Sequence, residues 1–158
     1  HRPTESKPNE PLRAAKARNV TLICTTSMRF PIRIDPGWQA PLLLIGAVPR
    51  SSHVTIEETR VHARFGISRF EAPIGRITRV EPIGWSLLGG IGIRLTPSGL
   101  AYTGSLQSVV RVSFDVPIRT RALGIPLSVP GFAASMQDPD GFIDAIARAI
   151  DGESSRSS

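Results

Sequence analysis

The chain has 158 residues, which is enough for one domain with its own hydrophobic core. Hydrophobic residues make up 41% and charged residues 20%, proportions that exclude a wholly disordered chain, a collagen-like repeat and a coiled coil. The single cysteine excludes a disulfide scaffold and any multi-cysteine zinc or iron–sulfur site within the chain. The formal net charge is +6, and nearly all of the cationic residues are arginine.

This charge is unevenly distributed along the chain. Residues 1–18 carry +3, residues 19–136 carry +6 and residues 137–158 carry −3, which together give +6. A basic body beside an acidic C-terminal segment has two interpretations. Either the body meets an anionic partner, or an acidic C-terminal helix lies near it and offsets its charge.

Both ends of the chain differ in composition from the middle. Residues 1–18 are polar and proline-rich and predict a flexible basic arm, whereas residues 152–158 predict a disordered tail. Residues 19–151 remain as a single β-rich domain. The chain has neither a run of about 20 apolar residues nor a signal-peptide pattern. We therefore expect a cytoplasmic protein and leave open peripheral contact with a membrane.

Two-residue alternation of apolar and polar side chains predicts strands in the first half of the domain. It runs through residues 28–35, 53–57, 60–65 and 69–72. Pro31 cannot donate a backbone hydrogen bond, so we expect the first strand to lie at a sheet edge. Residues 53–72 fit two antiparallel strands or a three-strand meander, with a tight turn at 57–59.

The second half of the domain predicts further strands and one long loop. Apolar residues recur at every third position from Ile74 to Ile83, which fits a turn followed by a strand near 77–81. Pro97-Ser98-Gly99 is a turn signal. Residues 117–131 contain three prolines and predict a loop. The remaining expected strands are residues 91–95, 100–102, 110–114 and 132–136.

One amphipathic helix is predicted over residues 139–151. Asp138 suits the N-cap and Pro139 suits the first helical position. Gly152 predicts the end of the helix. Phe142 and Ile146 belong to its apolar stripe, and we expect them in the core. Short strands followed by one such helix predict an α+β, mostly β fold, as a curved antiparallel sheet or small barrel capped by the helix. Pleckstrin-homology-like (PH-like) domains have this arrangement.

Residues 64–85 resemble a family of small uncharacterised actinobacterial proteins of mycobacterial type. The shared features are an Arg-Phe-Gly strand, a proline–hydrophobic step, a Val-Glu pair and a Gly-then-Trp segment. Residues 110–114, 132–137 and 138–142 resemble the closing strands and helix start of that family. A paired-arginine turn in the family is replaced here by residues 105–108. The resemblance implies no known reaction.

Cationic side chains share one face of a predicted strand. Arg60, His62 and Arg64 follow one another about 7 Å apart along that face, and Arg69 is expected on the neighbouring strand. Guanidinium groups donate paired hydrogen bonds to phosphates and carboxylates, so this row predicts a site for an anionic group or a partner protein. The alternative is a solvated face offset by the acidic residues Glu57, Glu58 and Glu71.

Three other features have plainer interpretations. Trp38 and Trp85 lie in predicted loops, where each is either an interface anchor or a cap on a barrel end. Cys24 lies in an apolar run and predicts a buried, unreactive thiol. Gly89–Gly92 is glycine-rich, but it lacks the helix and the lysine of a phosphate-binding loop, so we interpret it as a bend.

The sequence favours a non-catalytic binding or scaffold module without a cofactor. His1, His53 and His62 form no metal-binding pattern, and no acid–base or nucleophile set converges. The first alternative is a small β-barrel carrier of an apolar ligand, lined by residues 42–48 and 87–95. A nucleic-acid binder is a weaker alternative, because aromatics are not interleaved with the basic residues. The third alternative is an enzyme.

Overall fold

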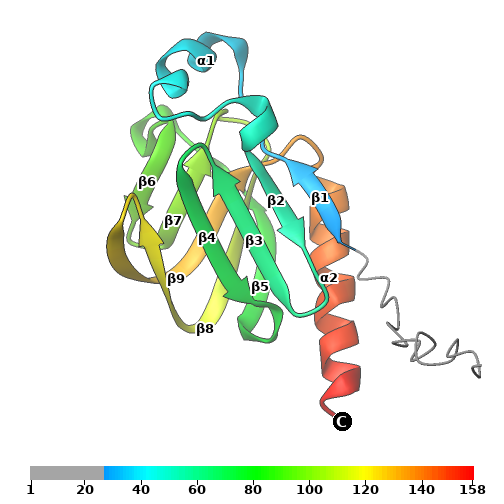
Figure 1. The fold of residues 1–158 in the computed structure, drawn as a ribbon. Helices are drawn as coiled ribbons and strands as arrows, with labels where there is room; N and C mark the ends of the chain where they lie inside the picture. The colour runs from blue at the N-terminus through cyan, green and yellow to red at the C-terminus, as the bar shows by residue number, and fades with distance from the viewer. Residues whose placement is uncertain (1–26) are drawn as a thin grey trace, which may run out of the picture.

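The computed structural model describes residues 27–158 and shows an α+β, mostly β fold with a C-terminal helix (Figure 1). Its strands form two sheets that do not close into a barrel. The predicted arm at residues 1–18 and Cys24 lie outside the described residues. Within the described part of the chain, no helix has the length and apolar character needed to cross a bilayer.

The first sheet consists of four antiparallel strands. These are β1 (Met28–Pro31), β2 (His53–Ile56), β3 (Arg60–Phe65) and β4 (Ser68–Pro73), in that order across the sheet. The predicted edge position of Pro31 and the predicted meander are both confirmed. The β3–β4 turn needs glycine at Gly66, which has a φ of 61° and where a Cβ would collide with the carbonyl oxygen of Ile45.

The second sheet has the strand order β5-β8-β9-β7-β6. Its members are β5 (Ile77–Ile83), β6 (Gly92–Thr96), β7 (Gly99–Thr103), β8 (Val109–Ala122) and β9 (Ile125–Ser135). Strands β7 and β9 are parallel, and the other neighbours are antiparallel. The β1 segment links the two sheets, because Ile32 bridges to Met136 just beyond β9.

The predicted loop at residues 117–131 is wrong, because these residues form the outer half of a β8–β9 hairpin. Its prolines occupy positions at which the pairing of β8 with β9 requires no backbone N–H donor. Pro117 and Pro130 fall in the irregular stretch of the β8–β9 pairing. Pro126 faces Arg121 at a position of the hairpin that makes no hydrogen bond to its partner strand.

The turn of this hairpin also lacks the usual sequence signal of a two-residue hairpin turn. Leu123 and Gly124 are its two central residues, with φ angles of 52° and 81°. Positive φ at both positions is typical of a type I′ turn, which asparagine–glycine normally forms. Leucine at the first position removes that signal and places a branched side chain in a left-handed conformation.

Two α-helices flank the sheets. Helix α1 (Pro36–Leu43) was not predicted, since it contains an internal proline, Pro41, and has no amphipathic stripe. Asp138 is the N-cap of helix α2 (Pro139–Arg156), as predicted. Its carboxylate accepts a hydrogen bond from the Gly141 N–H, with 3.0 Å between nitrogen and oxygen. Three short 3-10 helices complete the fold: η1 (Pro49–Ser51), η2 (Ile74–Arg76) and η3 (Leu87–Gly89).

Helix α2 is longer than predicted. It continues through Gly152 to Arg156, so the expected disordered tail is wrong for residues 152–156. The Arg156 guanidinium lies 3.5 Å from the Glu58 carboxylate, and this contact ties the last turn to the β2–β3 turn. Phe142 and Ile146 are buried in the core as expected. The Phe142 ring meets Phe30 edge-on, with 5.5 Å between ring centroids.

Replacing Phe142 with alanine tests this helix contact. We expect Phe142→Ala to lower the free energy of unfolding by about 3–5 kcal/mol, because it removes a fully buried ring and leaves a cavity. The measurement is urea denaturation followed by circular dichroism. Asp144→Ala, on the exposed side of α2, is the control and should change stability by less than about 0.5 kcal/mol. A Phe142→Ala effect as small as that of the control would contradict the packing.

The β8–β9 turn provides a second test of the fold. We expect Leu123→Asn to raise the free energy of unfolding by about 0.5–1 kcal/mol, because asparagine tolerates the left-handed conformation better than leucine does. Leu123→Val is the matched opposite, since a β-branched residue is strained at positive φ, and it should lower stability. Thermal unfolding of the three proteins measures the order, and a valine variant more stable than the asparagine variant would contradict the turn geometry.

Candidate functional site

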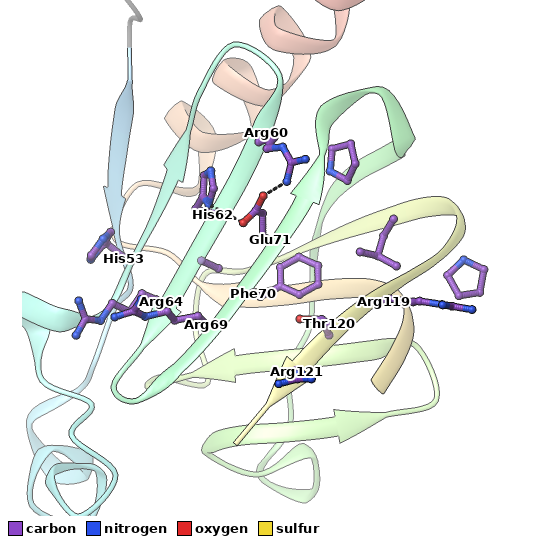
Figure 2. A pocket seen from close by; sticks show the side chains of 14 residues that line it. His53, Arg60, His62, Arg64, Arg69, Phe70, Glu71, Arg119, Thr120 and Arg121 are labelled. Carbon is purple, nitrogen blue, oxygen red and sulfur yellow. Dashed lines mark ion pairs between the residues drawn. The ribbon is translucent and has the colours of Figure 1, made fainter. Parts of the chain in front are cut away.

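The four basic residues predicted as a site lie on one face of the first sheet. Burial alternates along β3 and β4, and it places Arg60, His62, Arg64 and Arg69 on the face opposite the core. All four line one groove (Figure 2). The structure therefore brings these residues together, while the role assigned to them stays a prediction.

This groove, which we call the β4–β8 groove, has a volume of about 890 Å³. One wall is the outer face of β3 and β4, and the other is residues 117–121 of β8. Phe70 and Ile118 contribute apolar lining between the two walls. Figure 2 shows Arg119 and Arg121 on β8, with the Arg119 guanidinium directed away from Arg64 and Arg69.

Sequence analysis missed the two arginines of the β8 wall. Arg119 and Arg121 lie in the segment that we interpreted as a loop, so neither was assigned a face. A usable signal was present, because Ile118, Thr120 and Ala122 alternate with them in strand fashion. The three prolines of the segment concealed that alternation.

Acidic residues compensate one end of the groove. Arg60 forms an ion pair with Glu71. The His62 ring lies between two carboxylates, with Nε2 at 3.3 Å from Glu57 and Nδ1 at 3.5 Å from Glu71. The alternative of a solvated, charge-balanced face therefore describes Arg60 and His62 correctly.

The other end of the groove has an excess of positive charge. Strand register places His53 opposite Arg64, and Arg64 opposite Arg69, in one row across three strands. Like charges directly opposite one another on a sheet repel. Among residues 27–158, no carboxylate forms an ion pair with Arg64 or Arg69 of this row, or with Arg119 or Arg121 of the β8 wall.

His53 reports the positive potential at this end. Burial lowers the pKa of His53 below its usual value, and the positive charges of Arg29 and Arg64 lower it further. Arg29 Nη2 lies 3.0 Å from His53 Nδ1, so a neutral ring protonated at Nε2 accepts a hydrogen bond there. The surroundings of His53 thus disfavour protonation of its ring.

The two tryptophans lie apart from this groove. Trp38 lines a surface pocket of about 460 Å³ together with Leu42 and Leu87. Trp85 Nε1 donates a hydrogen bond to the Gly90 carbonyl at 2.9 Å and is close to η3. The segments 42–48 and 87–95 do meet in this pocket, as the carrier alternative predicts. The pocket opens on the surface, however, and is not enclosed by a barrel.

Comparison with known proteins assigns no family to the chain. No protein family matches it, and neither a curated protein nor a solved structure is significantly similar. The site is therefore interpreted from its geometry. In the part of the chain that the structure describes, no three His, Cys, Asp or Glu side chains gather in a way that could hold a metal ion.

The lowered pKa of His53 predicts a pH dependence of stability. Below about pH 6.5 an unfolded histidine takes up a proton, while folded His53 resists protonation until a lower pH. The unfolded state then binds more protons, so stability falls as the pH drops through this window. Arg64→Ala removes one cause of the shift. We expect it to raise the His53 pKa in an NMR titration and to make the loss of stability at acid pH shallower.

Arg79→Ala is the control for this experiment. Arg79 is exposed, paired with Glu81 and outside the groove, so its removal should leave the His53 titration unchanged. A His53 pKa that stays the same or falls in Arg64→Ala would show that Arg64 does not act on this ring.

Proposed function

We propose that the protein is a non-catalytic binding module that recognises an anionic group, carried by a partner protein or a small ligand, in the β4–β8 groove. The observation that carries this proposal is that four arginines from two sheets, Arg64, Arg69, Arg119 and Arg121, line one groove and form no ion pair among the described residues. A phosphate or carboxylate between the walls would replace the repulsion among them by charge-assisted hydrogen bonds.

The two walls suggest separate roles in binding. Arg64 and Arg69, which lie opposite each other on β3 and β4, would hold the anion, and Arg119 and Arg121 would add positive potential from β8. Neighbouring guanidinium groups suit a group with several acceptor oxygens, because each fork binds two of them. The Thr120 hydroxyl, also in the lining, offers a further donor.

The charge-balanced end of the groove restricts the ligand. Arg60 and His62 already face carboxylates there, so additional negative charge gains little at that end. This asymmetry favours a ligand with its negative charge concentrated at one end. Nucleic acid fits less well, because Phe70, the aromatic ring in the lining, is buried and offers no stacking surface. The actinobacterial resemblance and the cytoplasmic location stay predictions.

Titration with soluble polyanions tests this proposal. We expect the full chain to bind inositol hexakisphosphate in isothermal titration calorimetry, more weakly at high salt. The double variant Arg64→Ala/Arg69→Ala should bind about tenfold more weakly or worse, because each charge-assisted contact is worth about 1–3 kcal/mol before salt screening. Arg119→Ala/Arg121→Ala should lose affinity similarly.

Arg76→Ala/Arg79→Ala is the matched control for the net charge. Both arginines are exposed and paired with acidic residues outside the groove, so this variant loses two positive charges and should keep most of its affinity. An equal loss in the groove and control variants would indicate diffuse charge attraction. That result, or no binding by the unmodified chain, would reject the groove as an anion site.

A further inference from the structure

Large apolar side chains are exposed together around α1. Leu44 is 90% exposed and Leu88 is 99% exposed, so both project into solvent with almost no protein contact. Trp38, Ile67, Leu87 and Leu123 are also exposed. We call these six residues the apolar end. Single exposed leucines are ordinary on protein surfaces, whereas a contiguous group of them marks an interaction surface.

Structural contacts bring the apolar end together from four separate loops. Trp38 of α1, Leu87 of η3 and Leu123 of the β8–β9 turn line the same surface pocket. Ile67 of the β3–β4 turn joins them, because its N–H donates to the Ile45 carbonyl at 3.2 Å. Figure 1 shows α1 above the ends of the sheets, at the opposite end of the molecule from the C-terminus of α2.

The chain around the apolar end is rich in arginine, and the acidic residue at the start of α1, Asp35, is paired with Arg33. Segments 36–50, 64–70, 82–96 and 116–128 supply these loops and the strands next to them, and none includes an aspartate or glutamate. Their charged residues are all arginines: Arg50, Arg64, Arg69, Arg94, Arg119 and Arg121. Arg69 and Arg121 lie only two residues in sequence from Ile67 and Leu123. The apolar end is therefore bordered by positive charge.

Acidic side chains gather at the opposite end. Glu57 and Glu58 follow β2, and Glu58 contacts Arg156 in the last turn of α2. Asp151 and Glu153 lie in the last two turns of the same helix. These acidic residues and the apolar end thus lie at opposite ends of the described part of the protein, marked in Figure 1 by the C-terminus of α2 and by α1.

We propose that the apolar end docks on the surface of a lipid bilayer that contains anionic lipids. Leu44 and Leu88 would enter the boundary between headgroups and acyl chains, with Trp38 beside them. The bordering arginines would then lie at the level of the lipid phosphates. Apolar insertion combined with electrostatic attraction to anionic lipid is the usual basis of peripheral membrane binding.

The geometry favours a bilayer over the other occupants of an apolar surface. A carried ligand would contact the lining of the pocket, but Leu44 and Leu88 project outward from it. The arginine-rich border matches a surface that is negative throughout. This surface differs from the β4–β8 groove, and docking does not require the groove to bind a soluble anion.

Vesicle binding of the full chain tests the proposal. We expect co-sedimentation with phosphatidylcholine vesicles that contain about one third phosphatidylglycerol, and much weaker binding to phosphatidylcholine alone. Leu44→Ser/Leu88→Ser should bind about tenfold more weakly, because it removes the two inserted side chains. Both residues are almost fully exposed, so folding should be unaffected. Brominated lipids should quench tryptophan fluorescence in the unmodified protein and less in this variant.

Met28→Ser is the control, because Met28 is an exposed apolar residue that borders α2 and lies away from this surface. This variant should bind vesicles as well as the unmodified protein does. Vesicle binding that is absent, or unchanged in Leu44→Ser/Leu88→Ser, would overturn the proposal. A retained apolar ligand in a native mass spectrum, or a dimer that the double serine variant dissociates, would also overturn it by giving the surface another occupant.

Inositol hexakisphosphate binding separates this proposal from the groove function. Leu44→Ser/Leu88→Ser should retain hexakisphosphate affinity while it loses vesicle binding. If the unmodified chain binds vesicles but not hexakisphosphate, the groove function fails and membrane docking stands. If the unmodified chain binds hexakisphosphate but not vesicles, membrane docking fails and the groove function stands.

Discussion

A stack of aromatic rings between the two sheets determines the shape of the molecule. Phe70 of β4 lies parallel to Phe132 of β9, with ring centroids 5.0 Å apart, and 5.9 Å from Phe114 of β8. These rings hold β4 against the second sheet through side chains, without pairing its backbone to β8. The β4–β8 groove exists because the two strands approach but do not form a continuous sheet. Its basic residues are therefore mounted on rigid strands around a buried ring.

Charge is distributed along the molecule in a way that links the two proposed surfaces. Arg69 and Arg121 lie in the groove and also adjoin the loops of the apolar end. The acidic C-terminal helix does not neutralise these arginines, because its last turn contacts the β2–β3 turn at the opposite end through Arg156 and Glu58. Arg69 and Arg121 would thus lie near both an anion in the groove and an anionic surface at the apolar end.

Local patterns predicted most of the strands and failed where a proline or an unusual turn residue concealed them. Alternation located β2, β3 and β4 and placed Arg60, His62, Arg64 and Arg69 on one face, since side-chain direction in a strand depends only on the period of two. The outer half of the β8–β9 hairpin was missed because its prolines are tolerated by tertiary context. Arg119 and Arg121 were lost from the predicted site for the same reason.

The sequence alone determined the fold class, the amphipathic C-terminal helix and the basic face of β3, because each follows from the spacing of nearby residues. Tertiary structure decided which arginines remain without acidic partners: Glu71 reaches Arg60, while Arg64 faces Arg69 across the strands. It also decided that Trp38, Ile67, Leu87 and Leu123 share one end of the molecule. Such groupings arise from chain segments distant in sequence, and only the packing of the sheets and loops brings those segments together.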